Sequence, residues 1–136
     1  MKSALSLLKL SIVIALLAAL ASCQAATDSI VETKLKAEAA ALNKISPKDV
    51  TDGVRMDSVS TKGKSMRFNY TMLEYAKGDL DVPVFYKSAK EGLIKEANSN
   101  KDMSFFKEHK IQVAYAYYFK GGESLSTIII KAEDYK

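Results

Sequence analysis

An alternating segment near the C-terminal end narrows the range of folds more than any other part of the chain. In KIQVAYAYYFK, residues 110–120, apolar and aromatic side chains recur at every second position, which is the period of a β-strand. Gly121 and Gly122 then suit a two-residue turn, and SLSTIIIKA returns the chain as a second strand. Because both faces of that returning strand are apolar, we expect it at the centre of a sheet.

A second hairpin is expected earlier in the chain. Its first strand runs from Val54 to Val59 and alternates, so that Arg55, Asp57 and Val59 would share one face. Gly63 supplies a turn residue that tolerates positive φ. The second strand places large apolar side chains on one face, namely Met66, Phe68, Tyr70 and Met72.

Two helical patterns separate these hairpins. Apolar residues recur at helical spacing from residue 28 to residue 44, after the N-cap candidate Asp28 and before Pro47, and again from residue 84 to residue 98. The segment SPKDVTDG between the first helix and the first hairpin is expected to be a loop. The predicted fold is α+β, in the order helix, hairpin, helix, hairpin, with a four-stranded antiparallel sheet and the helices packed on one face.

Charge excludes one class of partner. The chain of 136 residues has 20 basic and 16 acidic side chains, a formal net charge of +4. The basic residues are scattered singly, without the runs or interleaved aromatic residues of nucleic-acid-binding surfaces. No nucleic-acid partner is therefore expected.

The N-terminus has the layout of a secretory signal. Lys2 and Lys9 precede the apolar run LSIVIALLAALA, residues 10–21, which is shorter than the roughly 20 residues that span a bilayer. We expect this segment to be removed during export.

The end of that segment resembles the bacterial lipobox, through Leu20, Ala21, Ser22 and Cys23. The resemblance implies recognition of the first three residues by the signal peptidase, cleavage after residue 22, and lipid attachment at Cys23, the single cysteine of the chain. An ordinary signal peptide with an incidental cysteine, or a free buried thiol, is the alternative. The lipobox reading gives a signal peptide over residues 1–22, a short tether over residues 23–29, and one α+β domain over residues 30–136.

Lipid attachment predicts a place in the cell envelope. Two or more acyl chains hold a protein stably at a membrane, so the membrane is an expected partner. Gln24 follows the cysteine where aspartate commonly retains a lipoprotein in the inner membrane. This favours the outer membrane, facing the periplasm, or the outer face of the plasma membrane in a Gram-positive bacterium.

The segment LNKISPKDVTDGVRMDSVSTKGKSMRFNYTML, residues 42–73, resembles a widespread group of small exported bacterial proteins of uncharacterised activity. Ser46 occupies a position where many members carry a cysteine. The resemblance implies export and fold, and it implies no activity. The residues that carry it are Leu42, Asn43, Pro47, Arg55, Asp57, Ser58, Tyr70 and Thr71.

The sequence offers little for catalysis. His109 is the single histidine, and we interpret it as a solvated loop residue because no second histidine or free cysteine accompanies it. Asp79 and Asp81 are interpreted as turn residues, since calcium loops carry more oxygen ligands. No enzyme, metal or cofactor is expected.

Three polar residues are candidates for contact with a protein partner. Tyr115 and Tyr117 continue the alternation of Val113 and Phe119, so core packing explains them. Tyr118 must point to the opposite face, where an exposed ring can anchor a partner or cover lysine stems. Arg55 and Asp57 would share a strand face, as an ion pair or as ordinary surface polarity.

We therefore predict a lipid-anchored, non-enzymatic domain that binds an envelope protein. Two alternatives stay open in the binding class: an envelope inhibitor, exclusion or immunity factor, and an assembly accessory of an envelope machine. A hydrolase that uses carboxylates alone is the enzyme alternative.

Overall fold

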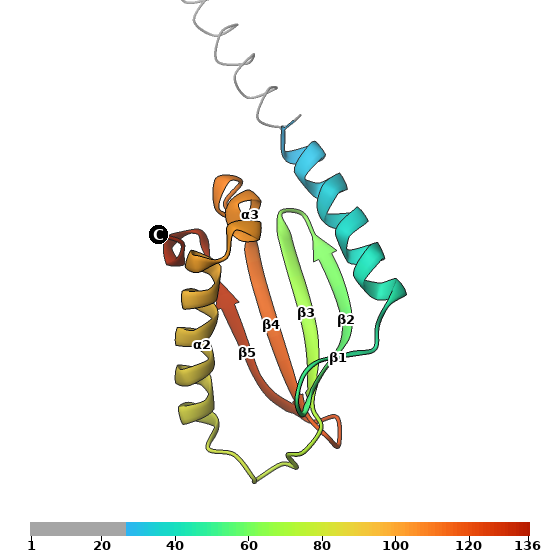
Figure 1. Ribbon diagram of the computed structural model, residues 1–136, viewed down its shortest axis with the longest axis vertical. Coiled ribbons are helices and arrows are strands. Elements are labelled where there is room, and N and C mark those ends of the chain that lie inside the picture. Colours follow the sequence, from blue (N-terminus) through green and yellow to red (C-terminus); the bar gives the residue numbers. More distant parts are fainter. Residues whose placement is uncertain (1–26) are drawn as a thin grey trace, which may run out of the picture.

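A computed structural model describes residues 27–136, so the predicted signal peptide, Leu20, Ala21, Ser22 and Cys23 lie outside the described residues. The chain begins with an N-terminal helix, described over residues 27–44. The elements that follow are β1 (Lys48–Thr51), β2 (Val54–Lys62), β3 (Ser65–Met72), α2 (Val82–Ser99), η1 (Lys101–Met103), α3 (Ser104–Glu108), β4 (Gln112–Phe119), β5 (Ser124–Ile130) and η2 (Ala132–Asp134) (Figure 1).

The five strands form one mixed sheet in the order β1-β2-β3-β4-β5. Three neighbouring pairs are antiparallel, but β3 and β4 are parallel. The predicted four-stranded antiparallel sheet is therefore wrong. After β3 the chain returns through α2 to the end where β3 began, as Figure 1 shows, so β4 must run in the same direction as β3.

Two further corrections concern the edges of the sheet. The segment SPKDVTDG, predicted as a loop, contains β1, which is short and ends in an irregular pairing with β2. The strand expected at the centre, β5, lies at the other edge. Ile129 makes the second face of this strand apolar, but this side chain is only half-buried and is not on the face that packs in the core.

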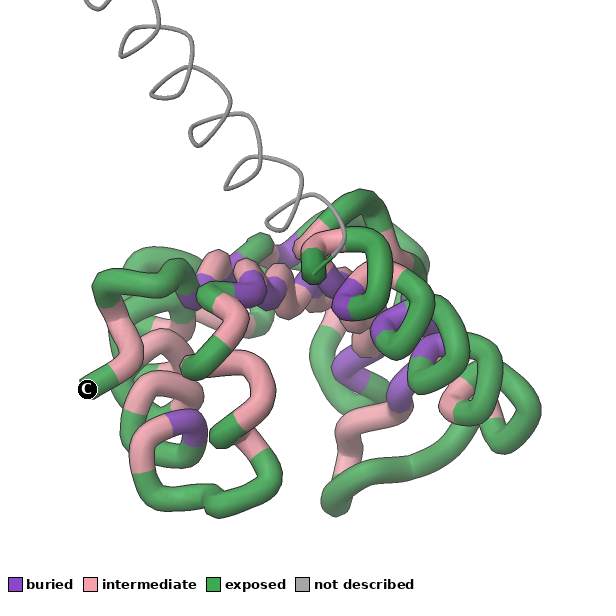
Figure 2. The backbone as a smooth tube through the Cα atoms, turned by 90° about the horizontal axis from the view of Figure 1, so that it is seen from above, coloured by how far each residue is buried: buried purple, intermediate pink, exposed green. Residues whose placement is uncertain are grey.

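Both long helices pack on one face of the sheet, and the opposite face stays open (Figure 2). The N-terminal helix buries Val31, Leu35 and Ala39, which are spaced four residues apart along one side. They pack against β2, β3 and β4 through residues such as Met66 and Val113. α2 covers β5.

A β-bulge in β2 overturns the predicted alternation of that strand. The pairing with β3 shifts between Met56 and Ser58, so Asp57 is an extra residue. The bulge turns Val59 into the core, where it is 3% exposed, although the sequence pattern placed it on the polar face with Arg55 and Asp57. Asp57 and Ser58 consequently share the open face.

The side chain of Asn43 links the N-terminal helix to β2 by hydrogen bonds. Asn43 accepts a hydrogen bond from the Val59 backbone N–H at 2.8 Å and donates one to the Val59 carbonyl at 2.7 Å. β1 pairs with β2 only as far as Met56, so the Asn43 amide replaces a strand neighbour beyond it. Among residues 27–136, no helix is both long and apolar enough to cross a membrane.

Candidate functional site

The N-terminal helix and α2 stand apart on the same face of the sheet (Figure 2). A groove lies on this face beside α2, and its lining includes no described residue of the N-terminal helix. Its volume is about 710 Å³, within the range of natural ligand pockets. The groove reaches from Val50 in β1 to Met103 in η1, with β3 and β4 as its floor and α2 as one wall. It is thus an elongated surface on the core side of the sheet that no element of the described chain covers.

The floor is a set of four aromatic rings that the parallel pairing of β3 and β4 brings into register. Phe68 lies opposite Tyr115, with ring centroids 5.6 Å apart, and Tyr70 lies opposite Tyr117, at 5.4 Å. Phe85 of α2 meets the Tyr117 ring edge-on at 5.2 Å. Rings in contact at these distances form a continuous apolar surface.

The tyrosine hydroxyl groups of the floor are neutral over the physiological pH range. Burial, with a smaller effect of Tyr117, raises the pKa of Tyr70 from 10.0 to about 12. Burial raises the pKa of Tyr115 still further, with help from neighbours that include Glu96, and burial raises the pKa of Tyr117. Within residues 27–136 none of these three hydroxyl groups has a hydrogen-bond partner. The floor is therefore uncharged but retains free donors and acceptors.

The wall made by α2 is formed by one stripe of the helix. The helix starts where Asp81 accepts a hydrogen bond from the Val84 backbone N–H at 3.0 Å, so this carboxylate caps a helix. A Cβ added at Gly92 would meet nothing within 4 Å, so small side chains in the stripe leave space beside the floor. The stripe consists of Phe85, Ala89, Gly92, Leu93 and Glu96, and the C-cap residue Asn100 continues it.

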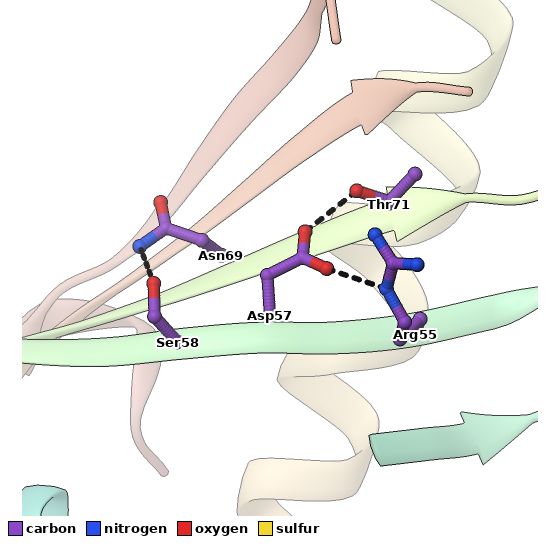
Figure 3. A network of polar contacts seen from close by, with 5 residues as sticks. All are labelled: Arg55, Asp57, Ser58, Asn69 and Thr71. Carbon is purple, nitrogen blue, oxygen red and sulfur yellow. Dashed lines mark hydrogen bonds and ion pairs between the residues drawn. The ribbon is translucent and has the colours of Figure 1, made fainter. Parts of the chain in front are cut away.

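The three predicted contact residues lie on the other side of the sheet, on the open face. Arg55 Nε is 2.7 Å from Asp57 Oδ1, and Thr71 donates a hydrogen bond to Asp57 Oδ2 at 2.6 Å (Figure 3). The Tyr118 hydroxyl accepts a hydrogen bond from Arg67 at 3.3 Å. The structure therefore brings Arg55, Asp57 and Tyr118 to one face, but each is paired within the chain and none lines the groove.

His109 and Asp79, the other titratable residues considered from the sequence, each contact a neighbouring group of the fold. His109 caps the end of α3, and its ring centroid is 4.6 Å from that of Phe105. Asp79 accepts a hydrogen bond from the Ala76 backbone N–H at 2.7 Å. No three His, Cys, Asp or Glu side chains gather into a metal-binding group within the part of the chain that the structure describes.

Sequence reasoning missed the groove. The alternation of Tyr115 and Tyr117 with Val113 and Phe119 predicts core residues, because it is the pattern of a buried strand face. The available signal was in the helix: Ala89 and Gly92 are too small to fill the space over a face of large rings. That signal becomes readable only once α2 is known to lie beside this face.

Comparisons with known proteins place the chain in a family. Residues 29–126 match the family described as "Domain of unknown function (DUF8479)". The chain belongs to this family. No curated protein matches the sequence.

Solved structures share the fold of this DUF8479 member at low sequence identity. A Pseudomonas aeruginosa protein described as secreted superposes with a TM-score of 0.64 and 13% identity, over 79% of this chain and 94% of that one. The pilotin EpsS of the Vibrio vulnificus type 2 secretion system gives 0.65 and 8%, over 80% and 94%. The type II secretion pilotin AspS of Vibrio cholerae gives 0.62 and 14%, over 82% and 97%.

Proposed function

We propose that this protein is a non-enzymatic assembly accessory of the bacterial cell envelope, anchored by lipid at Cys23, which holds an apolar helix of a protein partner in its groove. The observation that carries the proposal is the groove itself. Its aromatic floor and the α2 wall form an elongated apolar surface that the described residues, 27–136, leave uncovered.

The shape of the groove favours a helix as its occupant. The α2 stripe from Phe85 to Asn100 extends over about 22 Å, at a rise of about 1.5 Å per residue. A partner helix of similar length can lie along it and bury an apolar stripe against the rings. An extended peptide would present backbone donors and acceptors to a floor made of side chains, whereas a helix satisfies its own backbone.

The comparisons favour an assembly accessory over the other binding alternatives. Two of the similar structures are pilotins of type II secretion systems, and each is covered over nearly its whole length. No feature of the described residues favours an inhibitor or immunity factor.

Site-specific photo-crosslinking in intact cells tests the groove. A photoreactive phenylalanine analogue at Ala89 should capture one dominant envelope protein, and the analogue at Lys87, an exposed position outside the α2 stripe, should not. A Cβ at Gly92 meets nothing within 4 Å, so a tryptophan side chain there can project into the groove. Gly92→Trp should therefore abolish that capture, while Lys87→Trp should preserve it. A crosslinked product that still forms in the Gly92→Trp variant would refute the groove as the docking site. So would a product that forms only when the analogue is placed at Tyr118.

The anchor needs its own experiment. Labelled palmitate should be incorporated into the wild-type protein and not into Cys23→Ser, and the wild type should fractionate with the outer membrane of a Gram-negative host. Labelling of the Cys23→Ser variant would refute attachment at this residue.

A further inference from the structure

We propose that the groove selects a partner helix carrying one lysine or arginine within its apolar stripe, and that Glu96 receives this basic side chain. The inference rests on the proposed function, because it names the chemistry of the helix that the groove would hold.

Charge complementarity is the first argument. Among the described residues that line the groove, Glu96 is the single charged side chain, and all others are apolar, aromatic or neutral polar. It lies on the α2 stripe, one helical turn beyond Gly92, so its carboxylate borders the space that a partner would occupy. A cation is the complement of an otherwise uncharged groove with one negative group.

The rings beside Glu96 supply the second argument. Its charge acts on Tyr115, whose hydroxyl group, like those of Tyr70 and Tyr117, has no partner within residues 27–136. A lysine ammonium or arginine guanidinium brings several donors and no acceptor. It can therefore bond to the carboxylate and to a neutral phenol oxygen together, while its stem lies along the aromatic surface.

Desolvation supplies the third argument. In the free protein Glu96 is exposed, and water solvates its carboxylate. A fully apolar helix lying in the groove would remove part of that water and return nothing for it, which disfavours such a partner. A helix with one basic residue at the matching position replaces the lost hydration, so Glu96 would discriminate between helices of equal apolar character.

Selection from a displayed library of helical peptides tests this inference. The bait is the full acylated chain, purified from membranes in detergent, as wild type, Glu96→Gln, Gly92→Trp and Glu91→Gln. Glu91 is the matched control, since it is an exposed acidic residue of the same helix outside the groove stripe. Peptides selected by the wild type should carry lysine or arginine at one fixed position. Their affinity should fall about fivefold for Glu96→Gln, stay unchanged for Glu91→Gln, and be lost for Gly92→Trp.

The outcomes separate the two proposals. Peptides that are blocked by Gly92→Trp but lack a basic residue, or bind Glu96→Gln as well as wild type, would overturn the role of Glu96 and leave the groove standing. Peptides that all survive Gly92→Trp would overturn the groove, and the role of Glu96 with it. Binding of a fluorescent fatty acid that Gly92→Trp abolishes and Glu96→Gln does not weaken would assign the groove to an acyl chain and contradict both.

Discussion

The two faces of the sheet differ in how their polar side-chain atoms are hydrogen-bonded. On the open face, Asp57 is bonded by both Arg55 and Thr71, and Asn69 donates a hydrogen bond to Ser58 (Figure 3). Asn69 also accepts a hydrogen bond from Arg67. On the groove face, the hydroxyl groups of Tyr70, Tyr115 and Tyr117 have no partner among the described residues.

This difference favours the groove face as the site of the proposed partner. A polar network that is complete within the chain gains little from a new contact, because each group must first give up a bond it already has. Rings that are packed on one side and open on the other gain from any apolar surface that covers them, and their free hydroxyl groups gain a hydrogen bond as well. The face that sequence reasoning selected is therefore the self-contained one.

The largest expected effect on stability is the difference between substitutions at two adjacent residues of β3, Phe68 and Asn69, which point to opposite faces of the sheet. Phe68→Ala removes a half-buried ring from the stack with Tyr70 and Tyr115 and should lower the free energy of unfolding by about 3 kcal/mol. Asn69→Ala removes only side-chain hydrogen bonds on the open face and should lower it by less than about 1 kcal/mol. Urea unfolding of the two variants gives the comparison, and equal losses would contradict it.

A second contrast concerns two asparagines that each make two hydrogen bonds. Asn43→Ala leaves both backbone groups of Val59 without their partner and should cost about 2 kcal/mol of stability. Asn69→Ala is the control, because Ser58 and Arg67 can turn to water. The same urea titration measures both variants. A loss of unfolding free energy for Asn43→Ala as small as that for Asn69→Ala would show that the two hydrogen bonds between Asn43 and Val59 contribute little to stability.

The sequence predicted what depends on neighbouring residues. Period-two alternation identified the strands that became β3 and β4, and turn chemistry identified Gly63, where φ is +55°. It also predicted that Arg55 and Asp57 share a face, because each belongs to the polar side of one strand. Such patterns are local, so tertiary context had little opportunity to change them.

The sequence did not predict what depends on distant segments. The parallel pairing of β3 with β4 follows from the path of α2, and hydrophobic alternation is the same for a parallel and an antiparallel neighbour. The bulge at Asp57 adds one residue and so reverses the face of Val59. The groove needs both the parallel register of the rings and the position of α2, so it could not be read from either segment alone.

A smaller effect on stability is expected at high pH, where the tyrosine hydroxyl groups of the groove face lose their protons. The pKa of Tyr70 is raised from 10.0 to about 12, so the unfolded chain loses this proton at lower pH than the folded one. The corresponding stability is fully present below pH 10 and is lost as pH rises toward about 12. Because the ring is partly exposed, solvent screening keeps this loss at or below about 1 kcal/mol at pH 11.

Tyr70→Phe should reduce that loss. Urea unfolding of wild type and Tyr70→Phe at pH 8, 10 and 11 measures the difference between the two chains, in which the contribution of the lysines cancels. An identical decline in both chains would contradict the burial of the Tyr70 phenol against the groove.

The smallest effect, on capture of the partner, is expected for a substitution at Tyr118. This variant tests most directly whether the two faces of the sheet differ in binding. Tyr118→Ala frees one Arg67 nitrogen, which water can solvate on the open face, so capture of the partner from Ala89 should stay within twofold of wild type. The reason is positional, since Tyr118 lies on the opposite side of β4 from Tyr117 and the groove floor. If Tyr118→Ala instead reduced capture as strongly as Gly92→Trp, the partner would contact both faces. The bonded network around Asp57 would then be part of the interface.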